Sequence, residues 1–162
     1  MSSGFYGSNG QLNPHGGTPD KLLNQIISEF GPVFDPCPNN PTFDGLAIQW
    51  PREMVVYCNP PYTRGLISKF VKKCFDEWVA GSTVVLLIPN YSDTAYYHEY
   101  ILPYAEIRPL RGRLKFKGYG DKAASFPSIL CIYRQPKEGL ICLECGHSLI
   151  QCQCEPIEGG FE

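Results

Sequence analysis

Hydrophobic side chains between residues 18 and 31 recur at the spacing of an α-helix. The stretch TPDKLLNQIISEFG places five of them on one face: Leu22, Leu23, Ile26, Ile27 and Phe30. An apolar stripe of this width is typical of a helix that packs on a core. Thr18 is a good N-cap, Pro19 suits the first helical position, and Gly31 is a common stop signal. The pattern therefore predicts a helix from residue 19 that ends at Gly31.

Strands and further helices alternate along the rest of the chain. A second helical stripe covers residues 65–81, and residues 92–102 read as a short helix. Runs rich in β-branched and aromatic residues predict strands at 32–35, 54–58, 82–90, 105–110, 113–118 and 128–134. The run STVVLLIPN is apolar over most of its length, as in a parallel strand buried on both faces. This alternation predicts an α/β fold with a mostly parallel, doubly wound sheet, and ligands bind such sheets beyond the carboxyl ends of the strands.

The length and composition of the chain fit one main domain. A chain of 162 residues, 43% of them hydrophobic and 19% charged, buries about two-thirds of its surface on folding. No apolar run approaches the roughly 20 residues of a membrane helix, and the first residues do not read as a signal peptide. We therefore expect a cytoplasmic protein with a flexible segment at 1–17, the main domain at 18–137 and a cysteine-rich segment at 138–162.

The stretch MVVYCNPPYTRG ends a predicted strand with two prolines. Pro60 and Pro61 have no N–H group for a strand ladder, so the strand has to stop at Asn59. The stiff turn then presents two acceptors, the Asn59 side-chain oxygen and the Pro60 carbonyl. Two such acceptors can orient a planar exocyclic amine, such as N6 of adenine, toward an electrophile, and Tyr62 can stack on the base. The alternative is a turn that only ends a strand, although chance produces this tetrapeptide in only about one chain in two thousand of this length.

The order of several motifs resembles one enzyme family. Asn59-Pro60-Pro61-Tyr62 looks like the catalytic motif of S-adenosylmethionine-dependent amino-methyltransferases, which protein-glutamine and RNA methyltransferases share. The wider series, over roughly residues 18–134, is similar to the phage DNA N-6-adenine-methyltransferase (Dam-like) family. It comprises TPDKLLNQI, FDPCPNNPTFDGL, YCNPPYTRG, VVLLIPNYSDTAYYH, GRLKF and FPSILCIY, in that order.

The resemblance implies a Rossmann-like class I methyltransferase fold, S-adenosylmethionine as the cofactor and DNA as the partner; a phage-encoded member acts in the host cell cytoplasm. It implies that an acidic residue after the first strand accepts from the α-ammonium group of the cofactor. The implied cofactor-binding residues are Thr18, Pro19, Asp35, Pro36, Asp44 and Asn59, and the implied catalytic residues are Asn59, Pro60, Pro61 and Tyr62. The loop DPCPNNP departs from the family pattern because it has no glycine to let backbone approach the ligand.

A basic stretch follows the predicted helix at 92–102. It places five cations within ten residues that contain no acid: Arg108, Arg111, Arg113, Lys115 and Lys117. Most charge runs are solvated surface faces, but a DNA substrate favours phosphate binding for this one. An adenine in a duplex has to be flipped out, or met in a single strand, before its amine is accessible. We therefore expect the basic stretch, together with the loop around residues 91–98, to contact nucleic acid.

Four of the eight cysteines lie within thirteen residues, CLECGHSLIQCQC. In a cytoplasmic protein such a cluster favours metal over disulfides. Four thiolates suffice for a closed tetrahedral zinc site, and His147 is an alternative ligand. The sequence thus predicts a structural zinc knuckle held by Cys142, Cys145, Cys152 and Cys154, with free or redox-active cysteines as the alternative.

These observations favour DNA adenine methylation and leave other functions open. The alternatives are the same chemistry on RNA adenine or on protein glutamine, and a catalytically silent module that binds nucleic acid or protein on the same scaffold. The chain has no room for a large separate recognition domain, so a homodimer would be compatible with its small target-reading surface.

Overall fold

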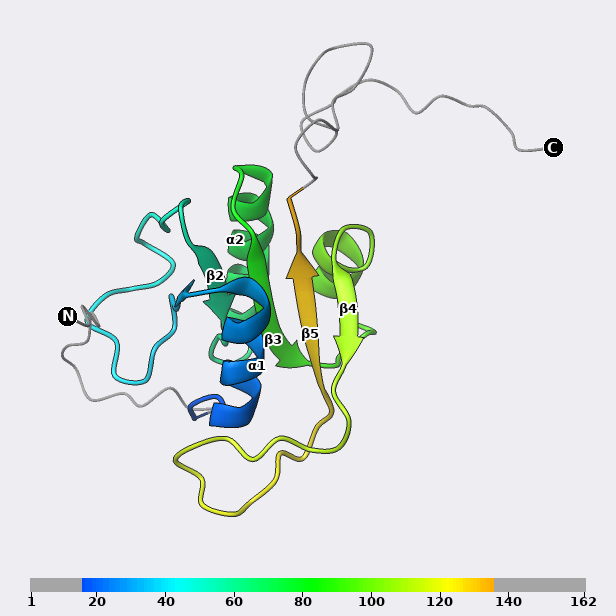
Figure 1. Cartoon of the computed structure of the whole chain (residues 1–162). Coiled ribbons are helices and arrows are strands. Elements are labelled where there is room, and N and C mark those ends of the chain that lie inside the picture. The colour runs from blue at the N-terminus through cyan, green and yellow to red at the C-terminus, as the bar shows by residue number, and fades with distance from the viewer. Residues whose placement is uncertain (1–15, 136–162) are drawn as a thin grey trace, which may run out of the picture.

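Five strands form one sheet in the order β1-β2-β3-β5-β4 (Figure 1). The computed structural model describes residues 16–135. The strands are β1 (Val33–Phe34), β2 (Val55–Cys58), β3 (Val84–Pro89), β4 (Glu106–Pro109) and β5 (Ser128–Tyr133). β1, β2 and β3 pair in parallel, whereas β5 runs antiparallel to both of its neighbours. The parallel arrangement predicted is confirmed for β1, β2 and β3, and β5 is the departure that makes the sheet mixed, because the connection from β4 to β5 contains no crossover helix that could make these two strands parallel.

Helices cover both faces of the sheet, as a doubly wound fold requires (Figure 1). Helix α1 (Asp20–Phe30) packs Leu22 and Ile26 on one face. Helix α2 (Leu66–Val79) and the π-helical turn η1 (Tyr97–Ile101) pack on the other. Every residue of β3 and β5 is buried, so these two strands form the centre of the fold between two hydrophobic layers.

The first helix begins later than the sequence predicts. Helix α1 starts at Asp20, Pro19 occupies the N-cap position, and no side chain caps the helix. The Thr18 hydroxyl lies instead 2.6 Å from the hydroxyl of buried Tyr57. The prediction of Thr18 as N-cap is therefore wrong, because strand β2 offers this hydroxyl a partner in the core. The predicted stop is confirmed: Gly31 follows the helix with a φ of 83°, which favours glycine.

Residues 113–118 do not form the predicted strand. They belong to the connection between β4 and β5. Among the described residues, this connection forms one isolated β-bridge, between Gly17 and Lys117. Positive φ angles of 92° at Gly118 and 61° at Gly120 turn the backbone away from an extended course. Phe116 is the buried residue of this stretch, so its inward side chain and the bridge between Lys117 and Gly17, and not a strand of the sheet, hold the segment in place.

The connection between β1 and β2 contains no helix or strand, as its proline content predicts. Trp50 is buried and donates from its indole nitrogen to the Gly45 carbonyl over 2.8 Å. A Cβ atom on Gly45 would collide with the Pro36 carbonyl, so the loop folds tightly back on itself at this glycine. Among residues 16–135, no helix has the length and apolar character needed to cross a membrane.

Candidate functional site

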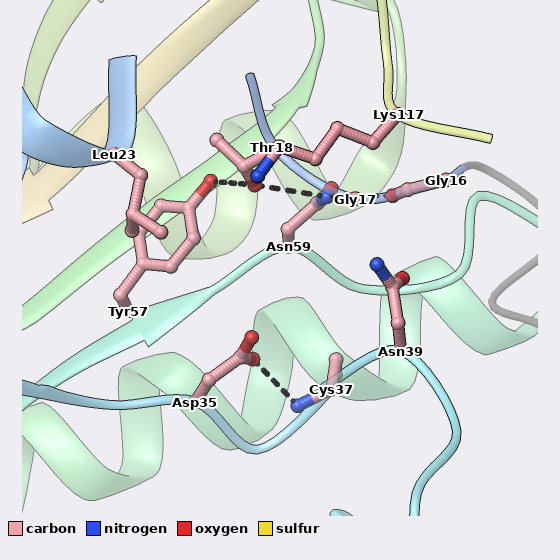
Figure 2. A pocket seen from close by; sticks show the side chains of 10 residues that line it. All are labelled: Gly16, Gly17, Thr18, Leu23, Asp35, Cys37, Asn39, Tyr57, Asn59 and Lys117. Atoms are coloured by element: carbon pink, nitrogen blue, oxygen red, sulfur yellow. Dashed lines mark hydrogen bonds between the residues drawn. The ribbon is translucent and has the colours of Figure 1, made fainter. Parts of the chain in front are cut away.

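A pocket opens beside the carboxyl ends of β1 and β2 (Figure 2). It is an open recess of about 500 Å³, solvent at its mouth included. The segment before α1, the loop after β1, the end of β2 and one residue of the loop after β4 all contribute to it. The lining residues are Gly16, Gly17, Thr18, Leu23, Asp35, Cys37, Asn39, Tyr57, Asn59 and Lys117. The pocket thus lies at the edge of the sheet where the fold class predicts a ligand.

Asn59 is a buried member of this lining, with only 3% of its surface exposed. Its amide nitrogen donates to the Thr18 hydroxyl over 3.3 Å and to the Gly16 carbonyl over 3.4 Å. Its oxygen accepts from the Tyr62 hydroxyl over 2.8 Å. Because donors and acceptors surround the amide from both ends, the positions of its nitrogen and oxygen are fixed by the network. Asn59 is therefore an oriented acceptor, the property that an amine-binding site needs.

The Tyr62 ring packs between two phenylalanines. It meets Phe116 and Phe126 edge-on, with ring centroids 6.1 and 5.6 Å away. Burial raises the pKa of Tyr62 well above its ordinary value, so the hydroxyl keeps its proton and donates. The structure thus brings Tyr62 next to Asn59, and it reveals a hydroxyl contact that the motif alone did not suggest.

Asp35 presents a carboxyl group to the pocket at the end of β1 (Figure 2). One of its oxygens accepts from the Cys37 backbone N–H over 2.8 Å. Burial raises the pKa of Asp35 to about 7, and the hydrogen bond from Cys37 opposes this shift. None of the salt bridges within residues 16–135 involves this carboxyl. A half-buried carboxylate that faces a pocket, with no basic partner among residues 16–135, is a suitable site for a cationic group.

Two glycines that the sequence analysis assigned to a flexible segment form one wall of the pocket. Gly17 exchanges two backbone hydrogen bonds with Lys117, of 3.0 and 2.7 Å. A Cβ atom on Gly16 would collide with the Lys117 carbonyl, and one on Gly17 with the Asn39 side chain. The loop after β1 has no glycine, and Gly16 and Gly17 instead lie across the pocket from it. In the sequence, the two adjacent glycines of HGGTP are the feature that could have indicated a close backbone approach here.

Three of the predicted cofactor residues are absent from this lining: Pro19, Pro36 and Asp44. Asp44 is exposed, and its side chain accepts from the Leu46 N–H over 2.9 Å. This is the local turn that Asp-Gly sequences commonly form. Thr18, Asp35 and Asn59, in contrast, come together from three separate segments.

The five cations of the basic stretch have different surroundings. Arg108 bonds to Glu29 and Glu106, and Arg134 joins the same two carboxylates. Lys117 lines the pocket and pairs with Asp20, and Lys115 lies 3.8 Å from Asp121. Arg111 and Arg113 are exposed and form no salt bridge with any other residue between 16 and 135. The stretch is thus part structural network and part exposed charge.

The predicted zinc ligands Cys142, Cys145, Cys152 and Cys154 lie outside the described residues. Within those residues, no group of three or more potential ligands is arranged to hold a metal ion. The four cysteines of the described part are buried and free, and the sulfurs of Cys37 and Cys58 lie 3.9 Å apart.

Comparison with known families gives one match, which covers most of the chain. The model of the family described as DNA N-6-adenine-methyltransferase (Dam) matches residues 17–144. No match was found among curated proteins or solved structures. The matched range begins at the pocket residue Gly17 and includes α1, the whole sheet and the turn at Asn59. The chain belongs to the DNA N-6-adenine-methyltransferase (Dam) family.

Proposed function

We propose that this protein transfers a methyl group from S-adenosylmethionine to N6 of adenine in DNA. One observation carries the proposal: the pocket combines the oriented side-chain oxygen of Asn59 with the carboxyl group of Asp35, which forms no salt bridge within the described part of the chain. The first suits an amine and the second a cationic cofactor group. Family membership supports adenine in DNA as the target.

The residues present fit the methionine half of S-adenosylmethionine. When bound, this cofactor supplies a methyl group on a positively charged sulfur, and it also carries an α-ammonium group. Asp35 would accept from the ammonium group. The Gly16–Gly17 wall lets backbone approach the ligand without side chains in between, and the Thr18 hydroxyl lies at the same wall. The pocket thus offers a counter-charge and close backbone contacts on opposite sides.

Asn59 and the Pro60 carbonyl would each accept one N–H of the target amine. The nitrogen lone pair then points along the line of attack, because both N–H bonds are held. The cofactor would supply the methyl group to this nitrogen, and the methylated amine would afterwards give one proton to water. The preorganised amide of Asn59 accounts for this orientation without a separate general base.

The DNA contacts of the proposal involve the basic stretch. Arg111, Arg113 and Lys115 are exposed cations on the loop that also supplies Lys117 to the pocket. Arg108 is a weaker candidate because two carboxylates already neutralise its guanidinium group. Phosphate contacts from this loop would bring the backbone of the target strand close to Asn59.

Methyl transfer from radiolabelled S-adenosylmethionine tests the proposal. Purified full-length protein is incubated with adenine-containing DNA, RNA or a protein pool. Label is expected in DNA as N6-methyladenine, and Asn59→Ala should abolish it, whereas Asn24→Ala on the exposed face of α1 should not. Label confined to RNA or protein would overturn the substrate, and failure to bind the cofactor in calorimetry would favour a silent binding module.

We also propose that residues 142–154 bind one structural zinc ion. Four cysteine thiolates within a short segment can close a tetrahedral site and supply folding energy to that segment. Metal analysis of the purified full-length chain is expected to give about one zinc per molecule, lost in Cys142→Ser/Cys145→Ser. Cys74→Ser, which changes a buried cysteine of the main domain, should keep the zinc. A metal content near zero in the unchanged chain would overturn the site.

A further inference from the structure

The loop between β4 and β5, residues 110–127, is far longer than its two strands require. These strands are antiparallel neighbours, and such pairs are commonly joined by two to five residues, roughly. The whole loop contains no helix or strand. Loops longer than about 12–15 residues without regular structure are usually functional when they are ordered. We call this segment the arm.

The arm is the basic part of an acidic protein. It contains five basic residues and one acidic residue, whereas the whole chain has a formal charge of −2. Arg111, Arg113 and Lys122 are exposed and form no salt bridge within the described range of 16–135. Positive charge is therefore concentrated on one projecting segment (Figure 1), which suits a polyanion better than a protein surface of mixed charge.

The tip of the arm holds an exposed aromatic ring. Tyr119 stands between Gly118 and Gly120, whose φ angles are 92° and 61°, and 46% of its surface is exposed. A Cβ atom on Gly16 would lie 2.8 Å from the Tyr119 ring, so the ring sits against the backbone at the pocket wall. The two flanking glycines allow the tight turn that places a large aromatic residue at this tip.

The middle of the arm, just before Tyr119, is anchored to the candidate site. Phe116 is buried and its ring contacts Tyr62. Lys117 exchanges backbone hydrogen bonds with Gly17 and pairs with Asp20. The arm thus joins the turn after β2 to the segment before α1, and it brings Lys117 and Tyr119 to the pocket wall.

We propose that the arm binds nucleic acid, with Arg111, Arg113 and Lys122 on phosphates and Tyr119 stacked on a base near the target adenine. The identity of the polymer as DNA rests on the proposed function. Basic residues with an interleaved aromatic ring are the combination that binds nucleic acid strands. Because the arm contacts both Tyr62 and Gly17, bound DNA lies where its adenine can enter the pocket.

Binding of fluorescently labelled DNA tests the arm without methyl transfer. Anisotropy is measured over a salt series, without S-adenosylmethionine, for a duplex and for a single strand of the same sequence. The plot of log affinity against log salt has a negative slope, and Arg111→Ala/Arg113→Ala is expected to reduce its magnitude by about 1.8 for the duplex, since each phosphate contact contributes about 0.9. The matched control Lys69→Ala/Lys72→Ala removes two exposed charges from α2 and should change the slope much less.

The stacking residue is tested on the same oligonucleotides. Tyr119→Ala is expected to weaken binding by about 5- to 100-fold, and Tyr119→Trp should retain it, because stacking contributes about 1–3 kcal/mol per base. Slopes that match the control, or equal affinity in Tyr119→Ala, would overturn the arm as the binding element. The proposed function can survive that result, because methyl transfer by the unchanged protein is measured separately. The arm proposal can likewise survive failure of the proposed function, because DNA binding through the arm can be measured in Asn59→Ala, which is expected not to methylate DNA.

Discussion

The Tyr62 hydroxyl donates to Oδ1 of Asn59 over 2.8 Å, and the Leu87 carbonyl lies 3.3 Å from the same hydroxyl. A phenol has one proton to donate, and here two acceptors are within reach. In the structure without substrate, the shorter bond holds the Asn59 oxygen in place. A rotation of the O–H toward Leu87 would release this contact when an amine donates to Asn59. Tyr62 therefore positions Asn59 through its hydroxyl.

Tyr62→Phe isolates this hydroxyl because the ring and its contacts with Phe116 and Phe126 remain. We expect the rate of methyl transfer to fall by about 2- to 13-fold, since the cost of losing one neutral hydrogen bond is about 0.5–1.5 kcal/mol. Single-turnover kinetics with saturating cofactor and DNA measure the change. Affinity for S-adenosylmethionine, measured by calorimetry, should stay within twofold. An unchanged rate would show that the hydroxyl does not position Asn59.

The elements predicted best from the sequence are those with a strong local period. The hydrophobic stripe of α1 and the apolar run of β3 each indicate which side chains are buried. The predicted bounds of both elements therefore agree with the structure to within a few residues. The stop after Asn59 also follows from local chemistry, because proline cannot extend a ladder. These features depend on neighbouring residues alone.

The features that the sequence did not reveal depend on contacts between distant residues. Thr18 meets Tyr57 across 39 positions, and Arg108 meets Glu29 across 79. Neither pairing leaves a periodic signal, so the local pattern predicts a helix cap at Thr18 and a phosphate-binding residue at Arg108. The reversal of β5 likewise depends on pairing with β3 and β4. The adjacent glycines Gly16 and Gly17 can be read in the sequence, but their close approach to Lys117 and Asn39 is visible only in three dimensions.

The hydrogen bond between Thr18 and Tyr57 predicts a coupled effect on stability. Both residues are buried, and their hydroxyls lie 2.6 Å apart. Thr18→Val should lower the free energy of unfolding by about 1–3 kcal/mol, because it leaves the Tyr57 hydroxyl without this partner. Tyr57→Phe should have a similar effect, and the double variant should cost less than the sum of the two. Urea unfolding measures all three; Thr18→Ser serves as the control and should stay close to the unchanged protein.

The ion network between α1 and the sheet edge predicts a small, salt-dependent contribution to stability. Hydrogen bonds from Arg108 and then Arg134 lower the pKa of Glu29 from 4.5 to about 2. A lowered pKa in the folded state means that the contribution is complete above pH 4.5 and is lost as the pH falls toward about 2. Because the partners are partly exposed, Glu29→Gln should cost only about 0.5–1 kcal/mol at pH 7 and low salt. Thermal unfolding of the unchanged protein and Glu29→Gln at 0.05 and 1 M salt measures this cost. Equal destabilisation by Glu29→Gln at both salt concentrations would contradict the prediction.

The raised pKa of Asp35 leads us to expect that the affinity for the cofactor depends on pH. Burial raises its pKa to about 7, and an ammonium group binds the ionised carboxyl. Affinity for S-adenosylmethionine should therefore rise about tenfold per pH unit below neutrality and level off above it. Calorimetry at pH 6, in buffers of different ionisation enthalpy, should show release of nearly one proton on binding. Asp35→Asn should bind weakly at every pH, and a pH-independent affinity in the unchanged protein would argue against this role.

We also expect that replacing the Asp35 carboxyl with an amide raises the free energy of unfolding. The pKa of Asp35 is about 7 in the folded protein, against an ordinary value of 3.8. Between these values the folded state holds a proton that the unfolded state has lost, so stability decreases as the pH rises through this range. Asn stays neutral and keeps the oxygen that accepts from Cys37, so it avoids this loss. Asp35→Asn should match the unchanged protein at pH 4 and exceed it above pH 7, by on the order of 1–2 kcal/mol after allowance for the carboxyl's partial exposure. Urea unfolding at the two pH values measures the difference, and a variant less stable at pH 8 would show that the Asp35 carboxylate contributes to folding instead of opposing it.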